Sequence, residues 1–500
     1  MHTAILCLAA VLGQPAEHAK YFRINVIDDV TQRGVPLVEL RTVNGIAHFT
    51  DSSGIVAFHE PGLMDQDVFF HVSSHGYEFP KDGFGFRGKP LRVTPGGEAT
   101  LKIHRVNIAE RLYRITGGGI YRDSVLLGVK PPTREPLLNG LVFGSDSVVN
   151  AVYNGKIYWF WGDTNKPSYP LGNFQVPGAT SKVGAAELGI DLDYFVDGKG
   201  FAKQTMKMPG TGPTWMTSLV VLSDEAGKDR LYASYIKIKP PMTVYARGFA
   251  VWDDAEQEFK HIAEVDMKAP AFANGHAFTH EGYVYFAHPF PVTRVKATAK
   301  SFLRAEEYES YTCVKEGGPL TPNLSPPEGR GEKMQLDRDD KGALRYAWRK
   351  NTPAVTAKEE TQWLKAGKIK AEEVRWRLRD SESGKVVMPH AGSVAWNEYR
   401  QRWIMIVAEV GGTSYLGETW YAEAETPTGP WKDAVKIVTH ERYSFYNPKH
   451  HPMLDTDKGR FIYFEGTYTH TFSGNPVQTP RYDYNQVMYR LDLSDKRLAK

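Results

Sequence analysis

One pattern recurs between Gly140 and the C-terminus, and it restricts the fold more than any other feature of the sequence. Each unit has a small or polar start, an apolar strand, a polar turn and an aromatic-rich return strand, and most units add a third strand. The five units begin at Gly144, Trp215, Asn274, His390 and His450, and they recur every 50 to 80 residues except after the third unit, which carries an insertion. Repeats of this length indicate arrays or propellers. We therefore predict an all-β fold, a five-bladed β-propeller over residues 140–500 that the C-terminal strand NQVMYRLDL closes.

In this fold, the ends of the strands show which residues lie on the same face of the ring. The first strand of a blade crosses from one face of the ring to the other and the second returns, so the start of one and the end of the other open on the same face. Applied to the five units, this rule gathers carboxylates, histidines and aromatics on one face: Asp146, Asp163, Trp215, Tyr235, His276, His288, His390, Glu409, Glu418, His450, His451 and Glu465. The turns on the opposite face contain ordinary polar residues. The segregation predicts an active site on the first face.

The first unit supplies the best acid pair. In GSDSVVNAVYNGKIYWFWGDTN, the dipeptide Asn154-Gly155 separates two apolar runs, which is a strong hairpin signal. A hairpin brings Asp146 and Asp163 to one edge although they are 17 positions apart. Two converging carboxylates suit acid/base chemistry on a glycosidic bond.

The N-terminal part has a different organisation. Residues 20–106 contain short alternating strands separated by Gly-, Asp- and Pro-rich turns, which predicts a small β-sandwich with an accessory role. Residues 107–139 form a connector with three consecutive glycines. Its Tyr121, Arg122 and Asp123 are candidates to reach the active site, and Asp123 is an outside candidate for the acid.

Two segments concern export and flexibility. Residues 1–19 have a short apolar core followed by small residues, typical of a cleaved signal peptide and of a periplasmic or secreted protein. Cys7 lies in this leader, so Cys313 alone would remain and no disulfide framework is expected. Within the third unit, residues 315–333 are rich in Pro, Gly and charge and are expected to be a flexible insert. Residues 359–379 suggest one or two short helices.

Composition excludes some partners and favours another. The formal net charge is +3 without a basic stripe, which argues against nucleic acid. No apolar run of 18 residues exists to span a membrane. Aromatics make up 12% of the chain, with 11 Trp and 26 Tyr. Such rings present flat apolar faces of the kind that pack on sugars, so we expect a carbohydrate partner.

The histidines allow a metal as an alternative. We expect no cofactor and no metal ligands, because a His at a strand start is more often structural or bonded to substrate. His450 and His451 are adjacent on an expected strand and point to opposite faces, so both cannot ligate one ion. A site built from His276, His390 and one of this pair would suit zinc, or a structural calcium on the propeller axis.

Two resemblances support these expectations. Gly140–Leu498 resembles the five-bladed propeller glycoside hydrolases, the group of arabinanases, xylosidases and invertases. The pairing GSD…WFWGDT is similar to that of propeller endo-D-arabinanases, in which both acids belong to the catalytic centre, and WYAEAETPTGPW resembles a blade-closing phrase of these enzymes. The Glu-Gly-Pro signature of arabinanase-xylosidases is not found. GVPLVELRTVNG…HFTDSSGIVAF resembles the transthyretin-like regulatory sandwich of secreted enzymes.

The sequence thus predicts a secreted glycoside hydrolase with paired-carboxylate catalysis. The catalytic candidates are Asp146 and Asp163, with Glu418 and Glu465 in reserve. The substrate-binding candidates are Trp215, His276, His390, His451, Arg481 and Tyr482. One alternative is a polysaccharide lyase using His and Tyr, which the histidines and Arg481-Tyr482 favour. The other is a non-catalytic carbohydrate-binding propeller, which predicts no close carboxylate pair.

Overall fold

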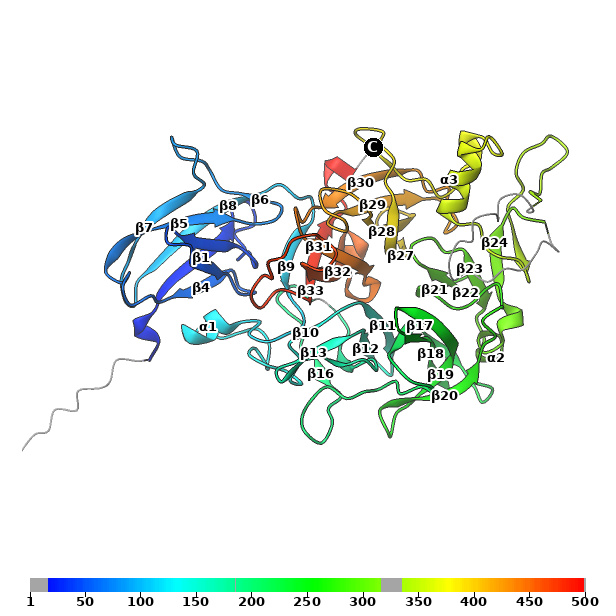
Figure 1. Cartoon of the computed structure of the whole chain (residues 1–500), viewed down its shortest axis with the longest axis horizontal. Helices are drawn as coiled ribbons and strands as arrows, with labels where there is room; N and C mark the ends of the chain where they lie inside the picture. Colours follow the sequence, from blue (N-terminus) through cyan, green and yellow to red (C-terminus); the bar gives the residue numbers. More distant parts are fainter. Residues whose placement is uncertain (1–16, 185, 316–334, 499–500) are drawn as a thin grey trace, which may run out of the picture. The chain divides into compact units, whose positions relative to one another are not determined.

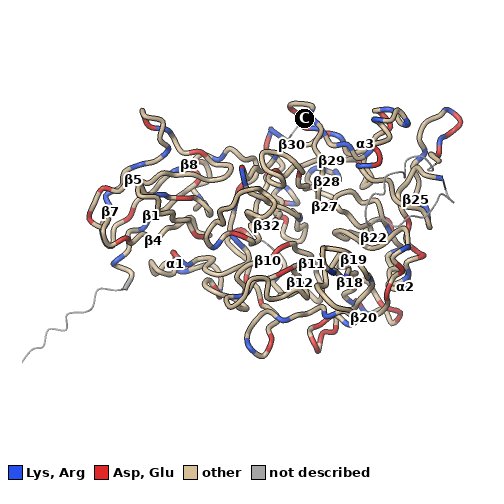
Figure 2. The backbone as a smooth tube through the Cα atoms, viewed as in Figure 1, with Lys and Arg blue, Asp and Glu red and all other residues tan. Residues whose placement is uncertain are grey.

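The computed structural model describes residues 17–184, 186–315 and 335–498, which form two compact units (Figure 1). Unit 1 comprises Met1–His104 and Tyr121–Pro131, and unit 2 comprises Arg105–Ile120 and Pro132–Lys500. Nearly all of the expected signal peptide and of the expected insert 315–333 lies outside the described residues. In the described part, no helix is long and apolar enough to cross a membrane. Lys and Arg are interspersed with Asp and Glu along the chain (Figure 2).

Unit 1 is the predicted β-sandwich. Its two four-stranded sheets share one core, to which Ile24, Leu40 and Phe70 contribute. Buried and partly exposed side chains alternate along the first strand, as expected for a sheet with one face on the core. The first sheet contains, in spatial order, β4 (Ile55–Phe58), β1 (Phe22–Asp28), β8 (Glu98–Arg105) and β6 (Tyr77–Glu78). The second contains β3 (Ala47–Phe49), β2 (Glu39–Thr42), β5 (Gln66–Ser73) and β7 (Gly88–Val93).

The segment 107–139 is more than a connector. It contains α1 (Arg122–Leu126), which belongs to unit 1. Asp51 of the TDSSG turn accepts hydrogen bonds from the Ser124 amide at 2.7 Å and the Ser124 hydroxyl at 2.8 Å. Asp123 is buried and accepts from the Ala57 amide at 3.3 Å. Asp123 therefore fastens the helix to the sandwich, and we no longer consider it a candidate acid.

Unit 2 contains the five predicted blades. Sheet one has β11 (Val148–Tyr153), β12 (Lys156–Trp161), β15 (Gly178–Lys182) and β16 (Asp193–Tyr194). Sheet two has β17 (Thr214–Ser223), β18 (Asp229–Lys239), β19 (Thr243–Asp253) and β20 (Glu258–Glu264). Sheet three has β21 (His276–His280), β22 (Tyr283–Ala287), β23 (Thr293–Lys296), β24 (Glu309–Thr312) and β25 (Ala347–Lys350). Sheet four has β27 (Pro389–Asn397), β28 (Arg402–Glu409), β29 (Thr419–Ala424), β30 (Asp433–Val438) and β26 (Arg379–Asp380). Sheet five has β31 (Ser444–His450), β32 (Phe461–Thr469), β33 (Asn485–Asp492) and β9 (Glu110–Arg114).

Small elements complete the two units. A three-stranded sheet contains β10 (Gly144–Ser145), β13 (Thr164–Lys166) and β14 (Tyr169–Asn173). The expected helices of residues 359–379 are α3 (Ala357–Lys365), which a Thr356–Glu359 capping box begins, and η4 (Ala371–Glu373). The other helices of the described residues are η1 (Glu17–Lys20), α2 (Ala299–Phe302), η2 (Ala305–Glu307), η5 (Pro452–Leu454), η6 (Asp457–Gly459) and η7 (Lys496–Leu498).

The blades follow one another around a ring. The first strands of successive sheets lie beside each other, from β11 through β17, β21 and β27 to β31. Apolar side chains fill the space between neighbouring sheets; Phe160 of sheet one, for example, packs with Trp252 of sheet two. Hydrogen bonds from Tyr446 and Lys449 to residues of the first blade join sheet five to sheet one.

The strand that completes the fifth sheet differs from the prediction. We expected the C-terminal strand to close the propeller, but β33 is the third strand and β9, from before the first blade, pairs outside it. Leu112 and Tyr113 of β9 are buried in the core shared with the first blade. The strand Glu110–Arg114, which precedes Gly140, is thus part of the propeller.

Candidate active site

The hairpin of the first blade has the predicted geometry. β11 and β12 pair in antiparallel register up to Tyr153 and Lys156, and the two turn residues have positive φ, 48° at Asn154 and 72° at Gly155. This is the turn type that an Asn-Gly hairpin favours. Beyond the other end, Ser145 of β10 pairs with Thr164 of β13.

Asp146 and Asp163 lie together where the paired strands meet. The Asp146 amide donates to the Asp163 carbonyl oxygen at 3.2 Å, and the Gly162 amide donates to the Asp146 carbonyl oxygen at 2.9 Å. The Asp146 carboxylate lies against Gly162, where any Cβ would collide with its Oδ1. The predicted convergence of the two acids is confirmed, and it depends on a glycine at 162.

Two tyrosine side chains hold the Asp146 carboxylate. The Tyr446 hydroxyl donates to Oδ2 at 2.8 Å, and the side chain of Tyr484 is also hydrogen-bonded to Asp146. Burial raises the pKa of Asp146 to about 6, although these hydrogen bonds to its charged form act in the opposite direction. Asp146 is therefore mostly ionised at neutral pH, and its orientation is fixed from the fifth blade.

Asp163 has fewer partners and a higher pKa. Burial and the nearby charge of Asp146 raise the pKa of Asp163 to about 7, while a hydrogen bond from the Trp215 side chain lowers it. Its Oδ1 is buried and accepts no hydrogen bond from any described residue. Two neighbouring carboxyl groups with different environments are the arrangement that separates an acid from a base.

The tyrosines were missed because the fifth blade was read in the wrong register. We placed its first strand at His450, but β31 runs from Ser444 to His450 and contains a bulge between Tyr446 and Lys449. Tyr446 stands near the start of β31, where the face rule applied to the correct register would have found it. Tyr484 lies just before β33, at a position with positive φ.

The register error also explains His451 and Glu465, which lie in a buried centre rather than on the face. Lys449 Nζ donates to Asn150 Oδ1 at 2.6 Å, and His451 Nδ1 lies 2.9 Å from Asn150 Nδ2. His451 Nε2 is 3.6 Å from Glu465 Oε1, and both side chains have 0% exposure. Both side chains are closed off from solvent, so the structure does not place them on the open face, and the binding role of His451 and the catalytic role of Glu465 stay predictions.

Protonation in this buried centre follows from desolvation. Burial raises the pKa of Glu465 to about 8, with a counteracting effect from Lys449, and it lowers the pKa of Lys449 to about 8. Burial and the nearby Lys449 charge hold the pKa of His451 well below its ordinary value. The side chains of this buried centre therefore carry few charges while they support the blades.

Glu418, Arg481 and Tyr482 also differ from expectation. Glu418 has 1% exposure and accepts from the Thr413 amide and the Thr439 hydroxyl, both at 3.0 Å. It thus secures a loop of the fourth blade, and its role as a catalytic reserve stays a prediction. Tyr482 has 3% exposure and packs 5.0 Å from the Arg114 guanidinium, so its ring offers no surface to a sugar. Arg481 is exposed, and its carbonyl accepts from Asn485 Nδ2 at 3.3 Å.

The remaining candidates keep surface for a ligand. Trp215 is partly exposed beside Asp163, and His276 is partly exposed with Lys449 and His288 near it. His390 is exposed and lies near His288. Among the described residues, no group of three or more His, Cys, Asp and Glu side chains has an arrangement that could hold a metal ion.

Comparison with known proteins gives weak likenesses only. No family model and no curated protein matches the chain. A structure of a putative exo-β-1,3-galactanase from Bifidobacterium bifidum is similar over 73% of this chain and 92% of its own, at 11% identity and a TM-score of 0.36. An α-L-arabinanase from Penicillium chrysogenum with arabinobiose is similar over 77% and 99%, at 13% identity and a TM-score of 0.37. The GH43_1 enzyme from Xanthomonas citri with xylotriose is similar over 70% and 86%, at 9% identity and a TM-score of 0.34. Similarity at this level extends neither to substrate nor to mechanism.

Proposed function

We propose that the protein is a glycoside hydrolase in which Asp163 is the proton donor and Asp146 the ionised partner. The observation that carries this proposal is the pair itself in two different environments: Tyr446 and Tyr484 donate to the Asp146 carboxylate and favour its charged form, whereas burial and the nearby Asp146 charge raise the pKa of Asp163. At neutral pH, this difference favours a proton on Asp163 and a charge on Asp146. A general acid with a pKa near the working pH is the most effective one.

The two carboxyl groups would have different roles in the reaction. Asp163 gives its proton to the glycosidic oxygen as the bond to the anomeric carbon breaks. Asp146, oriented by Tyr446 and Tyr484, either attacks that carbon or removes a proton from an attacking water. Carboxyl groups about 5–5.5 Å apart would retain the anomeric configuration, and a separation of about 6.5–9.5 Å would invert it.

The proposal also covers the location of the protein, its accessory domain and its substrate. We propose a glycan substrate and activity after export, which the leader-like residues 1–19 support. The sandwich of unit 1 would serve as a transthyretin-like accessory domain. Arabinan, xylan and β-1,3-galactan are the first polysaccharides to test, because the similar structures named above are described as an arabinanase, a galactanase and a xylotriose complex.

The experiment is product analysis on these polysaccharides and on polyuronates. The proposal expects new reducing ends without the ultraviolet absorbance of an unsaturated uronate. Asp163→Asn should lower turnover by about 10²–10⁴-fold, with an unchanged melting temperature because Oδ1 accepts no hydrogen bond from the described residues. Asp340→Asn, at an exposed position, is the matched control.

Three outcomes would contradict the proposal. Appearance of the unsaturated product would indicate a lyase, and binding of glycans without any turnover would indicate a carbohydrate-binding propeller. Near-normal activity of Asp163→Asn would show that this residue has no part in proton transfer.

A further inference from the structure

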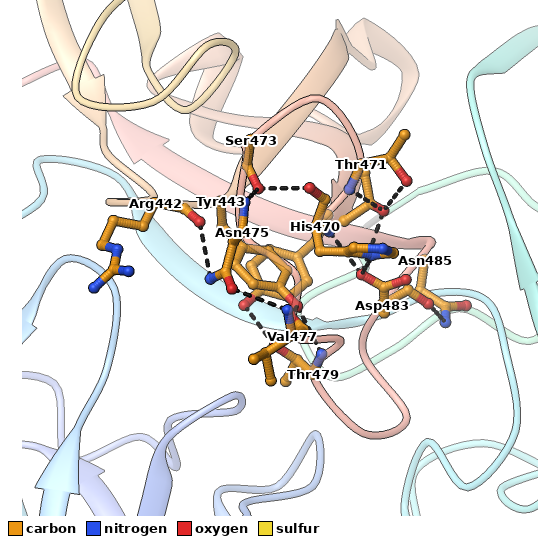
Figure 3. Close-up of polar contacts among 12 residues, drawn as sticks. Arg442, Tyr443, His470, Thr471, Ser473, Asn475, Val477, Thr479, Asp483 and Asn485 are labelled. Atoms are coloured by element: carbon orange, nitrogen blue, oxygen red, sulfur yellow. Dashed lines mark hydrogen bonds and ion pairs between the residues drawn. The ribbon is translucent and has the colours of Figure 1, made fainter.

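The loop that joins β32 to β33 is fastened at its base by a His–Asp pair. His470 Nδ1 lies 2.9 Å from Asp483 Oδ1, and the His470 amide donates to the same oxygen at 2.7 Å (Figure 3). The Thr469 hydroxyl also donates to Asp483, at 3.3 Å. These contacts close the loop next to Tyr484, the residue whose side chain bonds Asp146.

The body of the loop is held as firmly as its base. The Ser473 hydroxyl donates to the His470 carbonyl oxygen at 2.5 Å, and the Asn475 amide donates to Ser473 Oγ at 3.1 Å. On the other arm, the Tyr443 hydroxyl donates to the Val477 carbonyl oxygen at 2.7 Å (Figure 3). A loop with this many hydrogen bonds is preorganised, so a side chain that it presents loses little conformational entropy when it binds a ligand.

The side chain that it presents is Phe472. Phe472 is 58% exposed and has φ of 68°, a conformation that is unfavourable for a bulky residue. Its ring meets the Tyr446 ring edge to face, with centroids 5.7 Å apart and an interplanar angle of 81°. Because Tyr446 donates to Asp146, one aromatic ring separates Phe472 from a carboxylate of the acid pair.

We propose that Phe472 is the aromatic platform of a sugar subsite beside Asp146 and Asp163. A strained, exposed phenylalanine next to functional groups is expected where the surrounding structure holds it in place for a ligand. The ring has no polar group, so it suits the apolar face of a neutral sugar ring. This inference rests on the proposed function, and it assigns one sugar unit of the glycan to the loop.

The kinetic test compares two variants of the same loop. Phe472→Ala should raise KM about two- to tenfold on the polysaccharide that the wild type hydrolyses, with kcat within about twofold, because one stacked ring pair is worth about 0.5–1.5 kcal/mol. Phe472→Trp should keep the wild-type KM. The control is Val477→Ala, since Val477 is 65% exposed and carries no ring. An unchanged KM in Phe472→Ala would overturn the proposal.

A binding test separates this inference from the proposed function. In the Asp163→Asn background, xylotriose, arabinobiose and β-1,3-galactotriose are titrated by calorimetry with and without Phe472→Ala. The subsite requires that at least one probe binds and that Phe472→Ala weakens its binding about two- to tenfold. Equal affinity, or binding of none of the three, would overturn it. Wild-type protein that binds a probe through Phe472 without cleaving any glycan would refute the hydrolase and leave the subsite intact.

Discussion

The Tyr446 hydroxyl donates a 2.8 Å hydrogen bond to Asp146 Oδ2, joining the fifth blade to the first across 300 positions of the sequence. This bond favours the charged form of Asp146 and lowers a pKa that burial raises. The acid–base behaviour of the first blade therefore depends on a residue that the chain adds near its end.

Tyr446→Phe should shift the acidic limb of the pH profile to higher pH. Removing the bond takes away one of the hydrogen bonds that oppose the effect of burial, so the pKa of Asp146 rises above about 6 and its active, ionised form disappears at a higher pH. A hydrogen bond to a charged group is worth about 1.5–3 kcal/mol, so the shift should be about one to two pH units. The pH dependence of kcat/KM measures it. Tyr399→Phe, at an exposed turn, should leave the limb in place; a shift in both variants, or in neither, would contradict the assignment.

Glu465→Gln should change how stability depends on pH. The pKa of Glu465 is raised to about 8 in the folded protein, so its contribution to stability is present below the unfolded pKa of about 4.3 and is lost as the pH rises toward 8. Relative to Glu465→Gln, the wild type should lose up to about 1.4 kcal/mol of unfolding free energy per pH unit in this window. Urea unfolding at pH 5 to 8 tests it, and parallel curves for the two proteins would refute the shifted pKa.

Truncations should reveal that β9 belongs to the propeller. A chain that begins at Arg105 retains Glu110–Arg114 and should unfold cooperatively. A chain that begins at Asn139 lacks β9, exposes the edge of β33 and loses the buried Leu112 and Tyr113, so it should aggregate or melt at a lower temperature. Circular dichroism during heating compares the two. Equal melting temperatures would show that β9 adds nothing to the fifth sheet.

Residues 316–334 should be replaceable by an Asn-Gly turn. The residues on either side already meet, because the Lys315 amide donates to the Gln335 carbonyl oxygen at 2.9 Å and Val314 bridges Leu336. An Asn-Gly turn suits such an antiparallel pair. The melting temperature should stay within about 2 °C, equivalent to about 2 kcal/mol in a chain of this size. A larger drop would mean that the segment stabilises the third blade.

The sequence correctly predicted the structural features that depend on residues close together in the chain. Asn154-Gly155 fixed the hairpin, and the hairpin placed Asp146 beside Asp163, because a two-residue turn leaves one register. Pairings between distant segments were missed. β9 is a short strand whose partner lies at the other end of the chain, and the bulge in β31 breaks the alternation that would have located Tyr446. Arg481 and Tyr484 have positive φ, which the sequence did not predict. For this reason the sequence did not show that Tyr484, and not Tyr482, bonds Asp146.

The pairing of β9 with β33 also constrains when the propeller can form. Arg490 and Glu110, which are 380 positions apart, bond across these strands at 2.6 Å. At synthesis rates of about 5–20 residues per second, β9 would leave the ribosome roughly 20 s or more before its partner. During that interval β9 has no partner strand, and its unpaired edge is prone to aggregation. A chaperone that binds extended segments would therefore be most useful at Glu110–Arg114.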